Sequence, residues 1–89
     1  MTQADRVDAF RGLAHPLRRK VLRMLHEQEC TVTELLSAFG CSMPTLSRHL
    51  AILRETGLVT HRLAGAYRYY QLRRGAMRQI QTWLKPFEG

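Results

Sequence analysis

The sequence predicts a single, mainly α-helical domain that spans residues 1–89 and carries one β-hairpin, in the order α-α-α-α-β-β-α. Three observations predict this fold class. Apolar residues recur at helical spacing before Gly57 and again after Leu72, and two runs rich in β-branched and aromatic residues lie between these positions. A chain of 89 residues also has the length of one domain, which excludes repeat arrays and large multidomain enzymes.

The first two helices are expected to meet near Pro16. Thr2 is a candidate N-cap for the first helix. The apolar stripe of that helix consists of Val7, Phe10, Leu13 and Ala14. Proline is favoured in the first turn of a helix, where its missing N–H would have no partner, so Pro16 is expected to begin the second helix. The apolar face of the second helix consists of Leu17, Val21, Leu22, Met24 and Leu25.

A connector over residues 30–32 is expected to lead into a short third helix that ends at Phe39. Thr31 and Thr33 are both candidate N-caps, because a threonine hydroxyl can accept a hydrogen bond from a free N–H of the first helical turn. The apolar residues of this helix are Leu35, Leu36 and Phe39.

A turn over residues 40–42 separates the third helix from the fourth. Ser42 is a good N-cap, and the fourth helix is expected to run to about Thr56 and to stop at Gly57. Its inward-facing residues, at i, i+4 and i+7, are Leu46, Leu50 and Leu53.

The period changes after Gly57. Residues 58–63 and 67–72 predict two strands, which residues 64–66 join as a hairpin loop. A last helix is expected over residues 74–87. Its apolar stripe consists of Met77, Ile80, Trp83, Leu84 and Phe87.

The charge of the chain indicates a polyanionic partner. Fourteen Lys and Arg residues against seven Asp and Glu residues give a formal net charge of +7. Most of the excess lies in residues 43–76, which hold six arginines and one glutamate. Arginine predominates among the bases, and its guanidinium group can bind phosphates and guanine edges with two hydrogen bonds.

The third helix, the turn and the fourth helix together form a helix-turn-helix motif, whose second helix enters the major groove of duplex DNA. With the leucines inward, Pro44, Ser47, Arg48 and Ala51 point outward, and Thr45 lies at the flank. Arg48 is the side chain there that can bind guanine O6 and N7. His49 lies nearer the buried edge, where a packed histidine is as well supported as a DNA contact. The expected DNA-binding residues of the motif are Ser42, Met43, Pro44, Thr45, Ser47, Arg48 and His49.

The hairpin directly after the fourth helix is expected to be a wing. Arg62 and Arg68 flank its tip and could enter or border the adjacent minor groove. Tyr69 and Tyr70 are interpreted as packing residues rather than as stacking platforms for single strands, so duplex DNA is favoured over RNA.

Several other classes of protein are not supported. No apolar run approaches the ~18 residues of a membrane span, and the N-terminus has no signal-peptide pattern. Cys30 and Cys41 do not make a disulfide framework, so a reducing cytoplasm is the expected location. The chain carries no phosphate-binding glycine loop, carboxylate pair or nucleophile elbow, so neither an enzyme nor a cofactor is expected.

A family resemblance rests on five segments. They are LAHPLRRKVL at residues 13–22, TEL at 33–35, SMPTLSRHL at 42–50, LRETGLV at 53–59 and YYQL at 69–72. Together they resemble the ArsR/SmtB winged helix-turn-helix repressors over about residues 8–72. The resemblance implies a homodimer joined through the first and last helices. It also implies repression at a palindromic, inverted-repeat operator.

The chain departs from the metal-responsive members of that family. Thr31 and Thr33 stand where the resemblance leads us to expect a Cys-x-Cys pair, and hydroxyls are poor ligands for thiophilic ions. The last helix contains no His or Asp, so the second metal site of the family is missing as well. We therefore expect no metal site and no metal switch, as in the SdpR-like autorepressor branch that the chain resembles. The effector, if there is one, is not indicated.

The dimer interface is expected on the first and last helices. Its predicted residues are Val7, Phe10, Met77, Ile80, Trp83, Leu84 and Phe87. Such a stripe is too apolar to leave in water on so small a domain. The alternative is that the stripe packs only within its own chain, over the first two helices.

Three further interpretations stay open. A repressor switched by thiol chemistry would use Cys30 or Cys41. A winged-helix module that binds proteins instead of DNA is a second alternative, which the basic middle third disfavours. The cations at the start of the second helix oppose its dipole, so a partner is expected, either a phosphate or an Asp or Glu within the fold or dimer. We favour internal pairing for one of them and solvation for the rest. They are Arg18, Arg19, Lys20 and Arg23.

Overall fold

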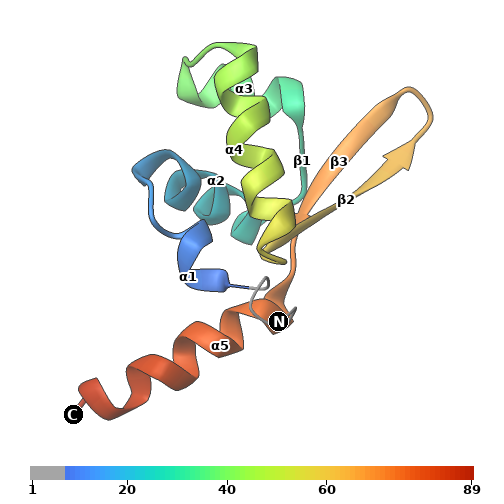
Figure 1. The fold of residues 1–89 in the computed structure, drawn as a ribbon. Helices are drawn as coiled ribbons and strands as arrows, with labels where there is room; N and C mark the ends of the chain where they lie inside the picture. The colour runs from blue at the N-terminus through green and yellow to red at the C-terminus, as the bar shows by residue number, and fades with distance from the viewer. Residues whose placement is uncertain (1–7) are drawn as a thin grey trace.

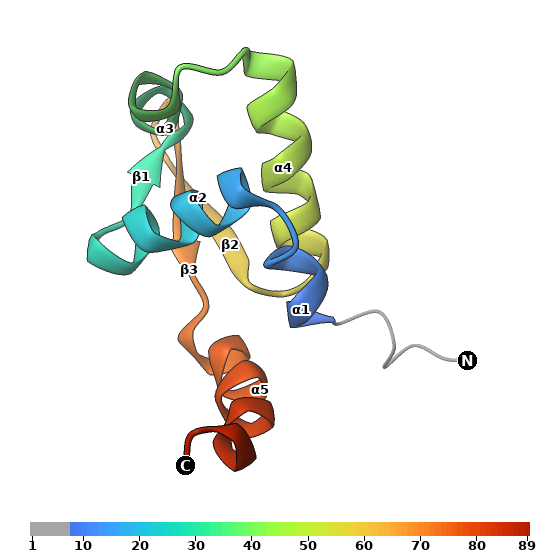
Figure 2. The same ribbon diagram turned by 90° about the vertical axis from the view of Figure 1, so that its left-hand side faces the viewer.

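A computed structural model describes residues 8–89 as a helical body from which a β-hairpin and the last helix project (Figure 1). The elements are α1 (Ala9–Gly12), α2 (Pro16–Glu27), β1 (Cys30–Thr31), α3 (Val32–Phe39), α4 (Met43–Glu55), β2 (Val59–Ala64), β3 (Tyr67–Leu72), α5 (Arg74–Leu84) and the 3-10 turn η2 (Lys85–Phe87). In both ribbon views α5 leaves the body at the end opposite α3 (Figure 2). The winged helix-turn-helix expected from the sequence is confirmed.

Helix α1 is shorter than expected. Its N-cap is Asp8, whose side chain accepts a hydrogen bond from the Phe10 N–H at 3.0 Å. The candidate cap Thr2 and the predicted interface residue Val7 lie outside the described residues. At the C-terminal end, the prediction that Leu13 and Ala14 belong to the helix was wrong, because Leu13 is the C-cap and Ala14 follows the helix.

Helix α2 begins at Pro16, as predicted. The preceding His15 is extended, with φ −145° and ψ 136°, as expected for a residue before proline. This extended residue keeps α1 and α2 from forming one continuous helix. The His15 Nδ1 accepts the Leu17 N–H at 3.0 Å, so the histidine is itself the N-cap of α2.

Of the two candidate caps for α3, the structure selects Thr31. The Thr31 hydroxyl accepts the Glu34 N–H at 3.2 Å, and the Glu34 carboxylate accepts the Thr31 N–H at 2.8 Å. This reciprocal capping box satisfies two N–H groups that a helix start would otherwise leave without a partner. Ser42 caps α4, and the chain turns at Gly57 with φ 79°.

The sheet contains one strand more than the sequence analysis predicted. Cys30 and Thr31, expected to be part of a connector, form β1 and pair antiparallel with Tyr70 and Tyr69 of β3. The three strands lie in the order β1-β3-β2. The wing is therefore joined, at the middle of β3, to the start of the helix-turn-helix.

The core lies between α2, α3, α4 and the base of the hairpin. The buried apolar residues are Ala9, Val21, Leu22, Leu25, Cys30, Leu35, Leu46, Leu50, Leu53, Leu58, Val59 and Tyr70. Helix α5 contributes none of them. No helix within residues 8–89 is long and apolar enough to cross a membrane.

Candidate nucleic-acid interface

The turn between α3 and α4 sets the direction of α4 relative to α3. Helix α4, the second helix of the helix-turn-helix motif, is called the recognition helix below. Gly40 caps the C-terminus of α3 with φ 61°, a left-handed conformation that side chains other than glycine rarely adopt. Two residues later the Ser42 Oγ accepts the Thr45 N–H at 3.3 Å and donates to the Thr45 hydroxyl at 2.9 Å. The two hydroxyls at the start of α4 are therefore held together on the surface.

Helix α4 divides into an inward and an outward face, as the leucine spacing predicted. Leu46, Leu50 and Leu53 are at most 2% exposed. The exposed residues on the other side are Ser42, Met43, Pro44, Ser47, Arg48 and Ala51, and Thr45 is half-buried. Arg48 forms no hydrogen bond or ion pair with another described residue, so its guanidinium group is available to a ligand.

His49 does not lie on that exposed face. The side chain is 8% exposed, and its ring packs on His15 with 4.4 Å between ring centroids. The Arg18 guanidinium donates to His49 Nδ1 at 2.9 Å, which fixes the ring as the neutral form with its proton on Nε2. Burial, followed by electrostatic interactions with His15, Arg18 and Arg48, lowers the pKa of His49. The packed histidine, one of the two alternatives left open by the sequence, is the arrangement found.

Among the cations at the start of α2, Arg18 is buried and bonded within the fold, as we expected for one of them. Besides His49, its side chain donates to the carbonyl oxygens of Gly12 at 3.1 Å and Arg11 at 3.2 Å. The partners are main-chain carbonyls and a histidine rather than the carboxylate or phosphate that we expected. The bonds join α1, α2 and the recognition helix.

The two arginines of the wing have different surroundings. Arg62 donates to both carboxylate oxygens of Glu29, at 3.0 and 2.6 Å, and its guanidinium carbon lies 4.9 Å from the Tyr69 ring centroid. Gln71 donates to the same carboxylate at 2.9 Å. The bond from Arg62 lowers the pKa of Glu29, and the same bond raises the pKa of Arg62. Arg68 is exposed and has no such partner among the described residues.

Sequence reasoning missed two features of this surface. Glu29 was not recognised as the partner of Arg62, because no local pattern relates residues 33 positions apart. A shallow cavity of about 440 Å³ also lies beside the C-terminal half of α4. Its lining residues are Ala51, Arg54, Glu55, Val59, Thr60 and Arg73. Arg54 and Arg73 extend the basic surface beyond the residues that we predicted.

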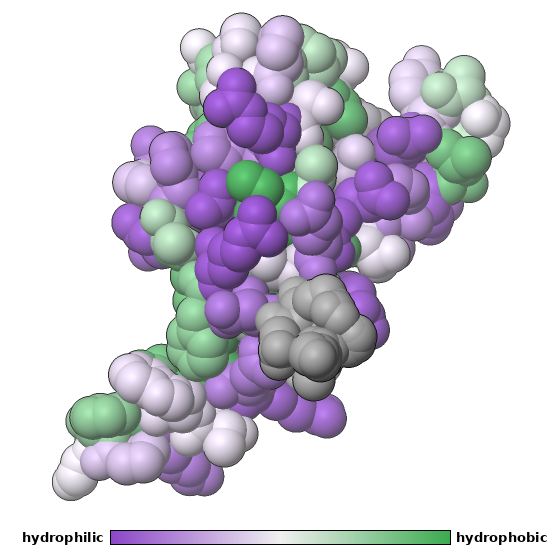
Figure 3. Space-filling model, in the orientation of Figure 1, coloured by the Kyte–Doolittle hydropathy of each residue, from purple (hydrophilic) through white to green (hydrophobic). Residues whose placement is uncertain are grey.

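The predicted dimer residues fall into two groups. Met77 and Ile80 are partly buried and pack against the core of their own chain, which is the intrachain alternative. Phe10, Trp83, Leu84 and Phe87 are 38%, 56%, 39% and 69% exposed. Phe10 and Phe87 both contact Trp83, with ring centroids 5.6 and 4.8 Å apart. In Figure 3 projecting α5 is mostly white, pale lilac and green, whereas purple predominates on the body above it.

The cysteines lie in different environments. Cys30 is buried and its Sγ donates to the Gln28 carbonyl oxygen at 3.4 Å. Burial, with the nearby charges of Glu34 and Glu29, raises the pKa of the Cys30 thiol. Cys41 is half-buried beside the turn. Within residues 8–89 no group of three or more His, Cys, Asp or Glu side chains is placed to hold a metal ion.

Comparison with known proteins places this surface among transcription regulators. Residues 13–62 match the family described as a helix-turn-helix domain. The chain is 28% identical over 80 residues to the transcriptional repressor SdpR of Bacillus subtilis, covering 90% of this chain and 89% of SdpR. It is 37% identical to the arsenic resistance transcriptional regulator ArsR1 of Pseudomonas putida, covering 86% and 70% of the two chains. A crystal structure of a possible transcriptional regulator for arsenical resistance superposes with a TM-score of 0.81 and 36% identity, over 90% of this chain and 83% of that one.

Proposed function

The chain belongs to the ArsR family of helix-turn-helix transcriptional repressors, and on that premise we propose that it represses transcription as a homodimer bound to an inverted-repeat operator, without a metal switch. The observation that carries the proposal is the outward face of α4. There Arg48, which has no partner within residues 8–89, projects among the small exposed residues Pro44, Ser47 and Ala51. The relatives are regulators and not enzymes.

Arg48 is the proposed base-reading residue. Small side chains at Pro44, Ser47 and Ala51 allow the backbone of α4 to lie close to the base edges, so that Arg48 can reach guanine in the major groove. The capped start of α4, with Ser42, Met43 and Thr45, faces a phosphate, which its free N–H groups and positive dipole end favour. Arg68 on the wing contacts the neighbouring backbone or minor groove.

A two-fold dimer explains why the operator would be an inverted repeat. It places two copies of α4 roughly 34–36 Å apart, one turn of DNA, and each copy reads one half-site. The exposed aromatic cluster of α1 and α5 supplies the proposed contact between protomers.

The absence of a metal switch is supported by the chemistry of α3. Thr31 uses its hydroxyl to cap the helix, and Thr33 offers no thiolate, so the start of α3 lacks the Cys-x-Cys pair, and Cys30 alone cannot complete a tetrahedral site. In this respect the chain is proposed to resemble the SdpR-like branch. A thiol switch is less well supported, because the raised pKa of Cys30 disfavours the reactive thiolate. Cys41 remains the candidate cysteine for that alternative.

The test is binding of the purified protein to a DNA fragment that carries its own promoter, in the presence of non-specific competitor DNA. Arg48→Ala should weaken specific binding by the ~1–3 kcal/mol of one bidentate base contact and leave non-specific binding nearly unchanged. Lys20→Ala is the matched control, since Lys20 is an exposed cation of α2. Equal affinity of wild type and Arg48→Ala would exclude this role for α4. Failure of the wild type to bind any DNA would favour the protein-interaction module.

The same DNA fragment tests whether the protein has a metal switch. Stoichiometric zinc, cadmium or arsenite should leave the complex intact. Release of DNA at one metal ion per protomer would contradict the proposal, and release by an oxidant that Cys41→Ser abolishes would assign a thiol switch instead.

A further inference from the structure

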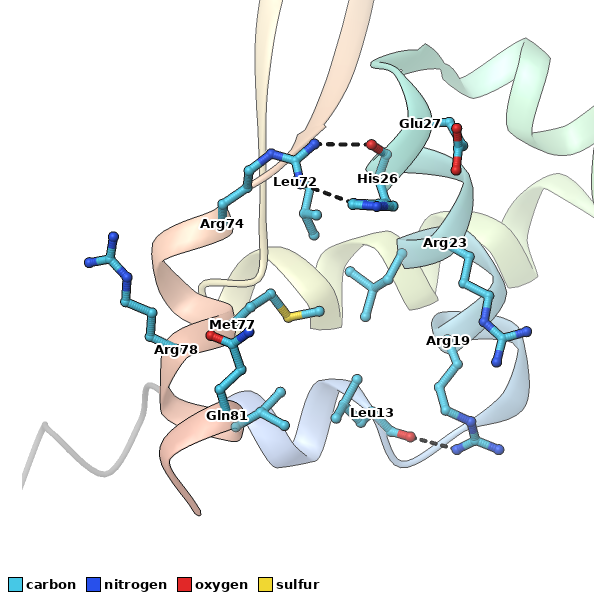
Figure 4. Close-up of a pocket in the computed structure, with 12 residues that line it drawn as sticks. Leu13, Arg19, Arg23, His26, Glu27, Leu72, Arg74, Met77, Arg78 and Gln81 are labelled. Atoms are coloured by element: carbon cyan, nitrogen blue, oxygen red, sulfur yellow. Dashed lines mark hydrogen bonds between the residues drawn. The ribbon is translucent and has the colours of Figure 1, made fainter. Parts of the chain in front are cut away.

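A cavity of about 710 Å³ lies between α2 and α5, away from the exposed face of α4 (Figure 4). Its apolar lining comes from four parts of the chain and consists of Leu13, Leu22, Leu72, Met77 and Ile80. Its polar lining consists of Arg19, Arg23, His26, Glu27, Arg74, Arg78 and Gln81. The volume falls within the ~300–1,000 Å³ of pockets that hold small molecules, and the mixture of an apolar floor with a few charged groups is typical of such sites.

The charged groups around this cavity are mostly cationic and differ in their bonding. Arg74 donates to His26 Nδ1 and to the His26 carbonyl oxygen, at 2.9 and 3.0 Å. Arg19 donates to the Leu13 carbonyl oxygen at 2.6 Å. Arg23 has no hydrogen bond or ion pair within residues 8–89, although Glu27 lies one turn further along α2. Figure 4 shows Arg78 pointing away from the cavity.

Arg23, which has no partner within residues 8–89, and Arg19, which uses only one of its N–H donors on Leu13, are the cations to which a ligand has access. They are four residues apart on α2 and so lie on one face of the helix, where two like charges repel each other. A carboxylate placed between them would remove that repulsion and accept hydrogen bonds in the paired geometry that guanidinium groups favour. The apolar side chains of Leu22, Met77 and Ile80 lie on the floor beside them.

We propose that the cavity between α2 and α5 binds a small amphipathic monocarboxylate, with the carboxylate on Arg23 and Arg19 and the apolar chain between α2 and α5. A second copy of this protein is a poorer occupant, because its proposed contact is the exposed aromatic cluster around Trp83 and not this arginine-lined cavity. The exposed apolar residues Trp83 and Phe87 also lie beyond the cavity lining. The site uses none of the proposed DNA contacts and does not depend on the proposed repressor function.

Methionine methyl NMR tests this site directly, with decanoate as the probe. The full chain labelled at its methionine methyl groups carries four reporters, of which Met77 lines the cavity and Met43 lies on the DNA face. Decanoate should shift the Met77 signal saturably and leave Met43 in place. Decan-1-ol and decyltrimethylammonium should bind at least about tenfold more weakly, since neither has a charge-assisted bond to arginine. Acetate, which has no apolar chain, should not bind measurably.

Paired variants separate the named site from general charge effects. Arg23→Gln should weaken decanoate binding about tenfold, as expected for one lost charge-assisted hydrogen bond. Lys20→Gln removes the same charge from an exposed position of α2 outside the cavity lining and should bind decanoate like the wild type. Both substitutions are at exposed positions, and circular dichroism verifies that each variant is folded.

Three results would overturn the proposal. The first is a Met77 signal that does not respond to decanoate. The second is equal affinity for decanoate and decyltrimethylammonium, or equal losses in the two variants. The third is a Met77 signal that moves on dilution of the protein but not with decanoate, which would assign the cavity to a second copy of the chain.

Discussion

Gly12 lies where α1 meets the end of the recognition helix. The residue is buried, and a Cβ atom there would collide with Leu58 Cδ1 and lie 2.9 Å from Thr56 Oγ1. Its carbonyl oxygen accepts the Arg18 Nε–H, so a shift of this backbone would also disturb the bonds of the buried guanidinium group. The close approach is possible only because residue 12 has no side chain.

Gly12→Ala should therefore lower the free energy of unfolding by about 1–3 kcal/mol, the usual cost of overpacking a well-filled core. Gly75→Ala is the control, because nothing lies within 4 Å of the added methyl group and alanine favours the helix in which Gly75 stands. Urea denaturation of the two variants checks the prediction. Equal stabilities would show that the body relaxes around the new methyl group.

The neutral ring of His49 makes stability depend on pH. In the unfolded chain a histidine has a pKa of about 6.5, whereas burial and neighbouring cations lower the pKa of His49 in the folded protein. The unfolded chain then takes up the proton more readily. The contribution of His49 to stability is complete above about pH 6.5 and is lost as the pH falls below it, by at most ~1.4 kcal/mol per pH unit.

His49→Gln should flatten this dependence, because glutamine offers Arg18 an acceptor oxygen but does not titrate. Thermal unfolding at pH 7.5 and 5.5 checks the prediction, with His26→Gln, an exposed histidine of α2, as the control. The wild type should lose more stability on acidification than His49→Gln. Some dependence should remain, because burial also lowers the pKa of His61. The same loss in His49→Gln and wild type would contradict the assignment.

At the scale of the elements, the wing is a hairpin whose two flanking arginines have separate tasks. Arg62 is bound to Glu29 and anchors β2 to the body, whereas Arg68 is exposed and has no ion-pair partner within residues 8–89, so we expect it to contact a phosphate. Arg68→Ala should reduce the slope of log affinity against log salt by about one per protomer, and Arg62→Ala should reduce it by less. DNA binding measured between low and moderate salt distinguishes the two. A larger change in slope for Arg62→Ala would mean that DNA displaces Glu29.

The elements that sequence reasoning predicted correctly are those with strong local signals. The leucine spacing of α4, its Ser42 cap and the glycine after it identified the recognition helix and its exposed face. Pro16 fixed the start of α2 in the same way. The outward position of Arg48 followed from the helical period alone.

The elements that were missed depend on partners far along the chain. Strand β1 has only two residues, and nothing local distinguishes them from a connector until Tyr69 and Tyr70 pair with them. The bond between Arg62 and Glu29 and the bond between Arg18 and His49 likewise form only once the fold brings distant segments together, so no local pattern predicts them. The early end of α1 was predictable in part, because His15 precedes a proline.

For the molecule as a whole, the exposed ends of α1 and α5 determine the expected assembly. Each apolar side chain that a second protomer buries contributes roughly 1.5–3 kcal/mol, and a few from each chain can outweigh the ~4–15 kcal/mol cost of association. Wild type should sediment as a dimer at micromolar concentration, and Leu84→Asp should sediment as a monomer with much weaker operator binding.

Leu63→Asp is the matched control for this experiment, because Leu63 is an exposed leucine of the wing, on a different element from α5. It should leave the dimer intact. A folded wild-type monomer would remove the basis for both the dimer and the inverted repeat. A dimeric Leu84→Asp would place the interface elsewhere.

The pairing of β1 with β3 also has a consequence for the order in which the chain folds. Cys30 meets Tyr70 only after α3, α4 and most of the hairpin have been enclosed in one loop. Closing such a loop costs entropy that contacts between sequence neighbours do not require. The helix-turn-helix and the hairpin, whose contacts are local, should therefore form early, and the strand that joins them should form after the rate-limiting step. A substitution at Cys30, the β1 residue that does not cap α3, would then speed unfolding and leave the rate of folding nearly unchanged.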